Sequence, residues 1–204
     1  MSWWRRTPLD AVRWVVVDCE TSGLDPRRDR LLAVGAVSIR GRRLELADAF
    51  AAVLEQSQPS APSNIVIHGI GAEAQLAGRP PREALGELAA FAAGAVPAAF
   101  HASFDAEVLR RACKAAGAPA LPRRWLDIAQ LAPALLSRRG SAPVALDDWL
   151  ARLGIAQQAR HDALGDAFVT AQLLLKLLQE AAHQRIGTLE ELMTAARARR
   201  WLKP

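Results

Sequence analysis

Two carboxylates stand two residues apart at the end of an apolar run. Asp18 and Glu20 follow residues 14–17, Trp-Val-Val-Val, a run typical of a central strand covered on both faces. Side chains two apart on a strand point the same way, so these two carboxylates would lie together. Their repulsion is relieved if a divalent cation lies between them, and such oxygen ligands suit magnesium or manganese. The pair alone does not establish a metal site, because most acid pairs of this spacing only face water.

Two further acids are predicted to join this pair. Asp105 lies just inside a predicted helix that follows a predicted strand, where a carboxylate can face the carboxyl end of a sheet. Its alternative role is that of a first-turn acid that interacts with the helix dipole. Asp166 lies in a long apolar helix, where a buried acid needs a partner. Its small neighbours Ala163 and Ala167 would let that helix approach the sheet closely enough to bring Asp166 to the other acids.

His161 is the candidate proton acceptor of this cluster. On one continuous helix His161 and Asp166 would lie about 140° apart, so we place the histidine in the loop before the helix. Asp162 is then the predicted N-cap, and the imidazole can reach over the carboxylates. A histidine there is suited to take a proton from a metal-bound water, because its pKa lies near neutral pH. The alternative is a surface histidine near a helix start.

The elements that must position these residues alternate between strands and helices. After the first strand, residues 31–40 and 44–54 read as a hairpin, and the polar, proline-bearing residues 55–63 read as a loop. Further along the chain, short apolar runs alternate with helical periodicity, which indicates an α/β or α+β domain with a mixed sheet. The predicted segments are a helix over 81–93 and a strand over 96–100. Four further helices are predicted: one that ends at 117, one that begins at 126, and two over 145–153 and 163–182.

Composition limits the classes of protein that fit. A chain of 204 residues, 51% of them hydrophobic, can bury one good core, and the formal charge of +5 is compatible with a polyanionic partner. The two cysteines, Cys19 and Cys113, form no Cys-x-x-Cys pair, so neither a disulfide framework nor a structural zinc site is expected. No signal peptide and no run of about 20 apolar residues is visible, so we expect no membrane insertion and a cytoplasmic location.

Three ordered motifs carry a resemblance to a known family. Residues 17–24, Val-Asp-Cys-Glu-Thr-Ser-Gly-Leu, form the first, residues 101–105, His-Ala-Ser-Phe-Asp, the second, and residues 160–167, Arg-His-Asp-Ala-Leu-Gly-Asp-Ala, the third. With these motifs the sequence resembles the DEDD exonucleases of the histidine-bearing subgroup, which includes the epsilon, or proofreading, subunit of DNA polymerase III. Two positions depart from the family pattern: Ala102 replaces the usual asparagine, and Ala33 replaces a glutamate of many relatives.

The resemblance implies a fold and a division of the chain. The expected fold is α/β, a ribonuclease H-like mixed β-sheet flanked by helices. Residues 1–182 would form the exonuclease domain and residues 183–204 a C-terminal helix and basic tail. In that tail Leu189, Leu192 and Met193 form an apolar stripe that could dock on a partner, although a plain terminal helix is the simpler interpretation.

The resemblance also implies roles for the acids and for His161. Asp18, Glu20 and Asp166 would hold the metal that binds the attacking water, and Asp18 would bridge to a second divalent cation, both being Mg²⁺ or Mn²⁺. Asp105 would support that second cation, and His161 would be the general base. Four further residues are predicted to contact the terminal nucleotide: Thr21, Leu24, His68 and Phe104.

The activity implied is two-metal hydrolysis at a nucleic-acid 3′ end. Single-stranded DNA is the expected substrate, and a DNA polymerase subunit or another protein is a second candidate partner. One alternative is an RNA-trimming exoribonuclease of the same fold. Another is a module of this fold that binds nucleic acid or a partner without cleaving it, although the filled catalytic positions count against it.

Overall fold

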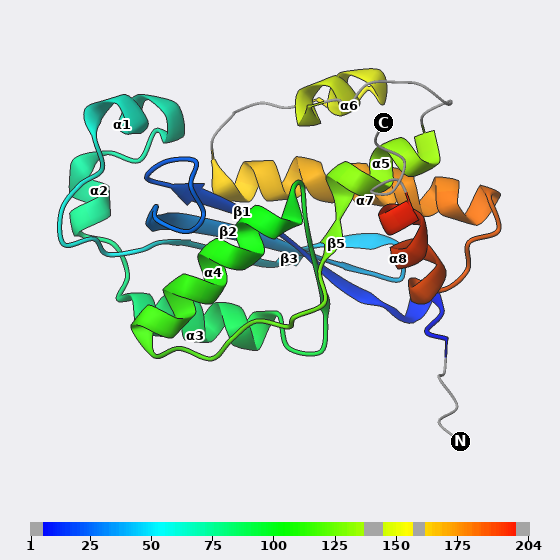
Figure 1. Cartoon of the computed structure of the whole chain (residues 1–204), viewed down its shortest axis with the longest axis horizontal. Coiled ribbons are helices and arrows are strands. Elements are labelled where there is room, and N and C mark those ends of the chain that lie inside the picture. The colour runs from blue at the N-terminus through cyan, green and yellow to red at the C-terminus, as the bar shows by residue number, and fades with distance from the viewer. Residues whose placement is uncertain (1–5, 137–144, 157–161, 199–204) are drawn as a thin grey trace.

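The central sheet has five strands in the order β3-β2-β1-β4-β5. The computed structural model describes residues 6–136, 145–156 and 162–198 (Figure 1). Strands β1 and β2 pair antiparallel, as do β2 and β3, whereas β4 pairs parallel with β1 and with β5, so the predicted mixed sheet with an opening hairpin is confirmed. The strands are β1 (Arg13–Thr21), β2 (Leu31–Arg40), β3 (Arg43–Val53), β4 (Val96–Ala99) and β5 (Leu126–Asp127).

Helices cover both faces of this sheet. The long helix α7 and the helices α5 and α8 lie on one face, and α3 and α4 lie on the other (Figure 1). The short helices α1 and α2 lie together beyond one end of the sheet, near the end of β1 (Figure 1). After a 3-10 turn, η1 (Leu9–Ala11), the helices are α1 (Pro62–His68), α2 (Ala72–Leu76), α3 (Pro81–Phe91), α4 (Ala102–Ala116), α5 (Ile128–Leu136), α6 (Leu146–Arg152), α7 (Ala163–His183) and α8 (Leu189–Ala198).

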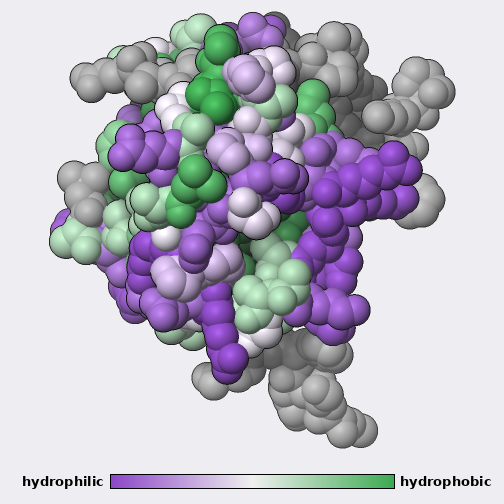
Figure 2. All heavy atoms as spheres, turned by 90° about the vertical axis from the view of Figure 1, so that its left-hand side faces the viewer, coloured by the Kyte–Doolittle hydropathy of each residue, from purple (hydrophilic) through white to green (hydrophobic). Residues whose placement is uncertain are grey.

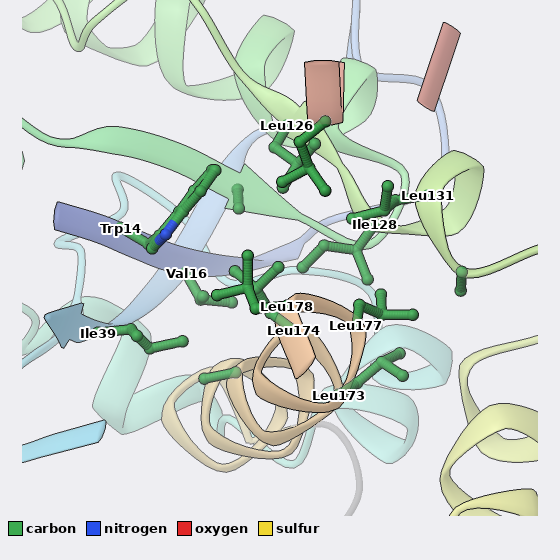
Figure 3. Close-up of a cluster of buried hydrophobic side chains, with 14 of the residues drawn as sticks. Trp14, Val16, Ile39, Leu126, Ile128, Leu131, Leu173, Leu174, Leu177 and Leu178 are labelled. Atoms are coloured by element: carbon green, nitrogen blue, oxygen red, sulfur yellow. The ribbon is translucent and has the colours of Figure 1, made fainter. Parts of the chain in front are cut away.

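Strand β1 divides two hydrophobic cores because its side chains alternate between the faces of the sheet. Trp14 and Val16 pack with the leucines of α7, as Figure 3 shows, and Val15 and Val17 pack with α3 and α4. All four side chains are almost fully buried. The continuous apolar run is thus explained by helices on both faces. The same alternation determines the face of the sheet to which each later side chain of β1 points.

Two local predictions differ from the structure. Leu126 and Asp127 form the short strand β5 rather than the start of a helix, because the backbone of Leu126 pairs with Ala98 of β4. The helix of this segment begins at Ile128, two residues after the predicted start. The predicted loop over 55–63 is also too long by two residues, because α1 begins at Pro62, and this helix ends where Gly69 takes a left-handed conformation, φ 69°.

The apolar stripe of the C-terminal segment is buried inside the chain. Leu189, Leu192 and Met193 of α8 belong to the same core as α5 and α7. This packing gives the stripe a partner within the chain, so the apolar surface suggested for docking is not exposed. Within the described residues, no helix is both long and apolar enough to cross a membrane.

Candidate active site

Three carboxylates converge where β1 meets the first turn of α7. One oxygen from each of Asp18, Glu20 and Asp166 lies within 4.8 Å of the others, and within the described residues these three form the group of acids suited to a metal ion. Asp18 and Glu20 follow Trp14 and Val16 on the face of β1 that packs against α7. The prediction that they point the same way and meet Asp166 agrees with this geometry.

The start of α7 fixes Asp166 relative to the loop before it. Asp162 is the N-cap, and its carboxylate accepts a hydrogen bond from the backbone N–H of Gly165 at 3.0 Å. The backbone N–H of Asp166 donates to the carbonyl of Asp162 at 2.8 Å, which closes the first helical turn. The predicted N-cap is therefore present. His161, the residue before it, lies outside the described residues.

Small side chains let α7 lie close to the sheet. Ala163 and Ala167, one turn apart, are buried at 5% and 0% exposure beneath the helix. Because both side chains are small, the helix backbone can lie close to the strands, as the sequence predicted. Asp166, between them, is also buried, with 6% exposure. An acid reaches the interior here because the helix approaches the end of β1.

Asp105 occupies the other face of β1. It is buried in the first turn of α4, where it accepts hydrogen bonds from the thiol and the backbone N–H of Cys19. Cys19 lies between the two acids of β1, and its side chain packs with the core under α3 and α4. Asp105 is thus not a member of the three-carboxylate group, although it contacts Cys19, which lies between Asp18 and Glu20 in β1.

The environment of this pair favours protonated forms. Burial raises the pKa of Asp105 to about 7, against the lowering effect of the Cys19 hydrogen bond, and the charge of Asp127 raises it further. Burial and the charges of Asp105 and Asp18 raise the pKa of the Cys19 thiol well above its usual range. The thiol therefore keeps its proton and acts as a donor to Asp105. A nearby cation would favour the ionised form of Asp105.

Asp127 is a supporting residue that the sequence did not single out. Its carboxylate accepts the backbone N–H of Ala129 at 3.0 Å and also that of His101. His101 has a left-handed backbone, φ 67°, at the turn from β4 into α4. Asp127 therefore ties the turn that precedes Asp105 to the start of α5. The sequence could have indicated this role of Asp127 only if residues 126–127 had been predicted as a strand.

The donor set fits a hard divalent cation. The group consists of three carboxylates, two of them at most 9% exposed. Carboxylate oxygens are the ligands that magnesium and manganese prefer. Three anionic groups at this separation repel one another, and a divalent cation relieves that repulsion better than any neutral donor. The residues present are therefore suited to the cation that the sequence predicted.

A pocket of about 660 Å³ opens beside Glu20. Its floor includes Ala33 and Ala51 of β2 and β3, and Val66 and Ile67 of α1 contribute to its wall. The first turn of α7 closes another side. Figure 2 faces the end of the molecule where α1 and α2 lie and shows hydrophobic side chains scattered among hydrophilic ones. The pocket thus combines the carboxylate of Glu20 and the ring of His68 with several apolar side chains.

The predicted nucleotide contacts are spread around this end of the molecule. Leu24 is 92% exposed in the loop after β1, and Phe104 is half-buried against the core under α3 and α4. The hydroxyl of Thr21 donates to the carbonyl of Gly23 at 2.6 Å, which shapes the same loop. Of the four predicted contacts, His68 lines the pocket beside Glu20.

The ring of His68 also holds the α1 segment in place. Its Nδ1 accepts the backbone N–H of Ile70 at 3.0 Å, and its Nε2 lies 3.1 Å from the hydroxyl oxygen of Ser60. Gln75 donates to the same Ser60 oxygen and to the Ile70 carbonyl, and accepts the Ser60 backbone N–H. All three side chains are buried. His68 thus braces the pocket wall formed by Val66 and Ile67.

A model of a known family matches most of the chain. The match covers residues 15–174, and the family is described as Exonuclease (RNase_T). The matched range contains the three carboxylates, Asp105 and the pocket described above.

Several relatives carry names from DNA replication. The chain is 35% identical over 198 residues to a DNA polymerase III subunit epsilon-like protein of Rhodobacter capsulatus, covering 94% of this chain and 27% of the relative. It is 32% identical to a PolC-type DNA polymerase III of Thermotoga maritima, covering 88% of this chain and 13% of the relative. A DNA polymerase III subunit epsilon of Treponema pallidum is 25% identical, with 85% of this chain and 80% of the relative covered. The chain thus spans only about an eighth to a quarter of the first two.

Solved structures share the fold. Exonuclease X in complex with 5′ overhanging duplex DNA aligns with a TM-score of 0.69 at 21% identity, covering 90% of this chain and 99% of that one. Exonuclease I of E. coli in complex with a dT13 oligonucleotide aligns with a TM-score of 0.71 at 16% identity, covering 85% of this chain and 42% of that one.

Proposed function

The chain belongs to the exonuclease family, and from that membership we propose that it is a metal-dependent 3′→5′ exonuclease acting on single-stranded DNA. It would release nucleoside monophosphates from the 3′ end. The observation that carries the proposal is the convergence of Asp18, Glu20 and Asp166 within 4.8 Å beside a pocket of about 660 Å³. The choice of DNA is supported by the names of the relatives, a PolC-type DNA polymerase III and a DNA polymerase III subunit epsilon-like protein.

The three carboxylates would hold one divalent cation, and Asp105 would support a second. The all-oxygen donor set favours Mg²⁺ or Mn²⁺. A cation bound there supplies electrostatic stabilisation of the charge that develops on the phosphate and favours ionisation of the attacking water. The chain contributes ligand geometry: β1 presents Asp18 and Glu20 from one side, and the first turn of α7 presents Asp166 from the other.

The pocket would take the terminal nucleotide. Its volume lies in the range of about 300–1,000 Å³ that is usual for small-ligand sites. The carbon atoms of Val66, Ile67 and Ala51 offer a surface for the base and sugar, and Glu20 marks the end where the scissile phosphate would lie. Because the hydrogen bonds among His68, Ser60 and Gln75 hold the pocket wall in place, the nucleotide would enter a preformed site.

His161 would take the proton of the attacking water. This role rests on the resemblance of residues 160–167 to the third family motif and on the position of His161 directly before the N-cap Asp162. A neutral imidazole near pH 7 can accept a proton from water and release it to solvent. We expect His161→Ala to lower the rate about 10²- to 10⁴-fold while Mn²⁺ still binds the carboxylates.

A DNA polymerase is the proposed protein partner. The support is that relatives of this chain are named as an epsilon subunit or as a PolC-type polymerase. Mixing the chain with the polymerase catalytic subunit of its own organism should give one complex in gel filtration. Separate elution at micromolar concentrations would argue against this partner.

The activity is tested by digestion of a 5′-labelled single-stranded DNA oligomer with Mg²⁺ or Mn²⁺. A ladder that shortens from the 3′ end, abolished by chelator and by Asp18→Ala, is the expected result. Asp10→Asn is a matched control, because it removes one carboxylate that is exposed and paired with Arg42 far from the group. That variant should digest DNA at the wild-type rate.

An RNA oligomer of the same sequence tests the substrate class. Much faster digestion of RNA would replace DNA by RNA in the proposal and would make the chain an exoribonuclease. No digestion of either oligomer in both metals would refute the proposed activity.

A further inference from the structure

Gly35 lies at the contact between the sheet and the start of α7. It pairs with Asp18 across β1 and β2. A Cβ atom at Gly35 would meet backbone atoms of Ala163 and Leu164 at well under 3.0 Å, a separation that real Cβ atoms essentially never show. The space for a side chain is thus filled by helix backbone, which cannot rotate away as a flexible side chain could.

The same helical turn carries a ligand of the proposed metal site. Asp166 follows Leu164 by two residues, and its backbone N–H is bonded to Asp162. Asp18, another ligand, lies directly opposite Gly35 on the neighbouring strand. The separation between Asp18 and Asp166 therefore depends on how closely the first turn of α7 rests on Gly35.

We propose that Gly35 is a positioning residue, which brings Asp166 within reach of the cation shared with Asp18 and Glu20. The inference rests on the proposed function and adds a residue that touches neither metal nor substrate. Carbon atoms in ordinary contact lie about 3.5–4.0 Å apart, so a methyl group at position 35 moves the helix start by about 1 Å. A displacement of about 1 Å can cost roughly a hundredfold in rate.

The rest of the fold can absorb this change. Leu173, Leu174 and Leu177 anchor α7 in the core from its third turn onward, and each is fully buried. The atoms nearest to the added Cβ belong to residues 163 and 164, at the start of the helix. We therefore expect Gly35→Ala to fold, with a displaced first turn and a loosened carboxylate group.

The test compares Gly35→Ala with wild type by calorimetric titration of Mn²⁺, by circular dichroism and by digestion of the DNA oligomer. The variant should keep its helical signal, bind Mn²⁺ at least tenfold more weakly, and digest DNA about a hundredfold more slowly at limiting Mn²⁺. Part of the lost rate should return at high Mn²⁺ concentration. Purely structural damage would lower the melting temperature without this selective loss of metal affinity.

Gly86→Ala is the matched control. Gly86 lies inside α3, and an added Cβ there meets nothing within 4 Å, so Mn²⁺ affinity and rate should equal those of wild type. Wild-type affinity and rate in Gly35→Ala would overturn the inference, and so would failure of that variant to fold even with saturating Mn²⁺. A wild-type protein that neither binds Mn²⁺ nor digests DNA would instead refute the proposed function.

Discussion

Cys19 and Asp105 are joined by a hydrogen bond on the face of β1 opposite to Asp18 and Glu20. One strand thus contacts two acidic environments, with the three-carboxylate group towards α7 and the Cys19 and Asp105 pair towards α4. A shift of β1 along its axis would move both together. The proposed site is therefore coupled through the backbone of a single strand.

The fourth acid should differ from the other three in metal binding. Because Asp105 lies outside the group of Asp18, Glu20 and Asp166, Asp105→Asn should change the affinity of the first Mn²⁺ less than threefold. Asp166→Asn removes a member of the group and should weaken it at least tenfold, about 1.4 kcal/mol. Both variants should digest DNA slowly. Calorimetric titration measures the difference, and equal losses of affinity would show that Asp105 shares the first cation.

The thiol of Cys19 should matter as a hydrogen-bond donor. Cys19→Val removes the donor to Asp105, and a lost hydrogen bond to a charged group costs about 1.5–3 kcal/mol, so DNA digestion should slow roughly tenfold or more. Cys19→Ser keeps a donor at the same position and should stay within about threefold of wild type. Equal rates for the serine and valine variants would show that the hydrogen bond has no part in positioning Asp105.

The floor of the pocket can be filled without touching the core. Ala51 is exposed and lines the pocket, so a phenylalanine there should occupy the space for the terminal nucleotide and raise KM for the DNA oligomer at least tenfold. Mn²⁺ affinity should not change. Ala49→Phe, also exposed and two residues earlier on β3, lies outside the pocket lining and is the matched control. An unchanged KM in Ala51→Phe would place the nucleotide elsewhere.

The sequence predicted the parts of this site that depend on local pattern. The period of two along β1 places Asp18 and Glu20 together, and Asp162 caps α7 as its residue type indicates. Cys19 was visible, but only the packing of α4 reveals that it serves Asp105. The role of Gly35 could not be derived from its neighbours in the sequence, because the backbone that fills its space is about 130 residues away. Likewise Leu126 joins the sheet only because β4 offers a partner strand.

Acid should weaken the protein partly through Asp48. The hydrogen bond from Ser38, followed by contacts with Arg13, lowers the pKa of this carboxyl below its ordinary value of about 3.9. The ionised carboxylate therefore stabilises the folded state above about pH 4, and that contribution is lost as the pH falls through the folded pKa. Asp48 is 43% exposed, so we expect less than about 1 kcal/mol.

Asp48→Asn should therefore lower the melting temperature slightly at pH 7 and flatten its decline between about pH 5 and 3. Thermal unfolding followed by circular dichroism over that range measures both effects. Ser38→Ala removes the first cause of the lowered pKa and should flatten the decline in part. If the melting temperature of Asp48→Asn falls as steeply with pH as that of wild type, the Asp48 carboxylate does not contribute to the loss of stability in acid.

Thr170 offers a stabilising substitution one turn after Asp166. Its hydroxyl is buried, and among the described residues it has no hydrogen-bond partner. Valine has nearly the same shape without the buried polar atom, so Thr170→Val should raise the free energy of unfolding by about 1 kcal/mol in urea denaturation. Thr194→Val in α8 is the control, because that exposed hydroxyl donates to the Glu190 carbonyl and its removal should bring no gain. A loss of stability and of Mn²⁺ affinity in Thr170→Val would instead show that the hydroxyl supports Asp166.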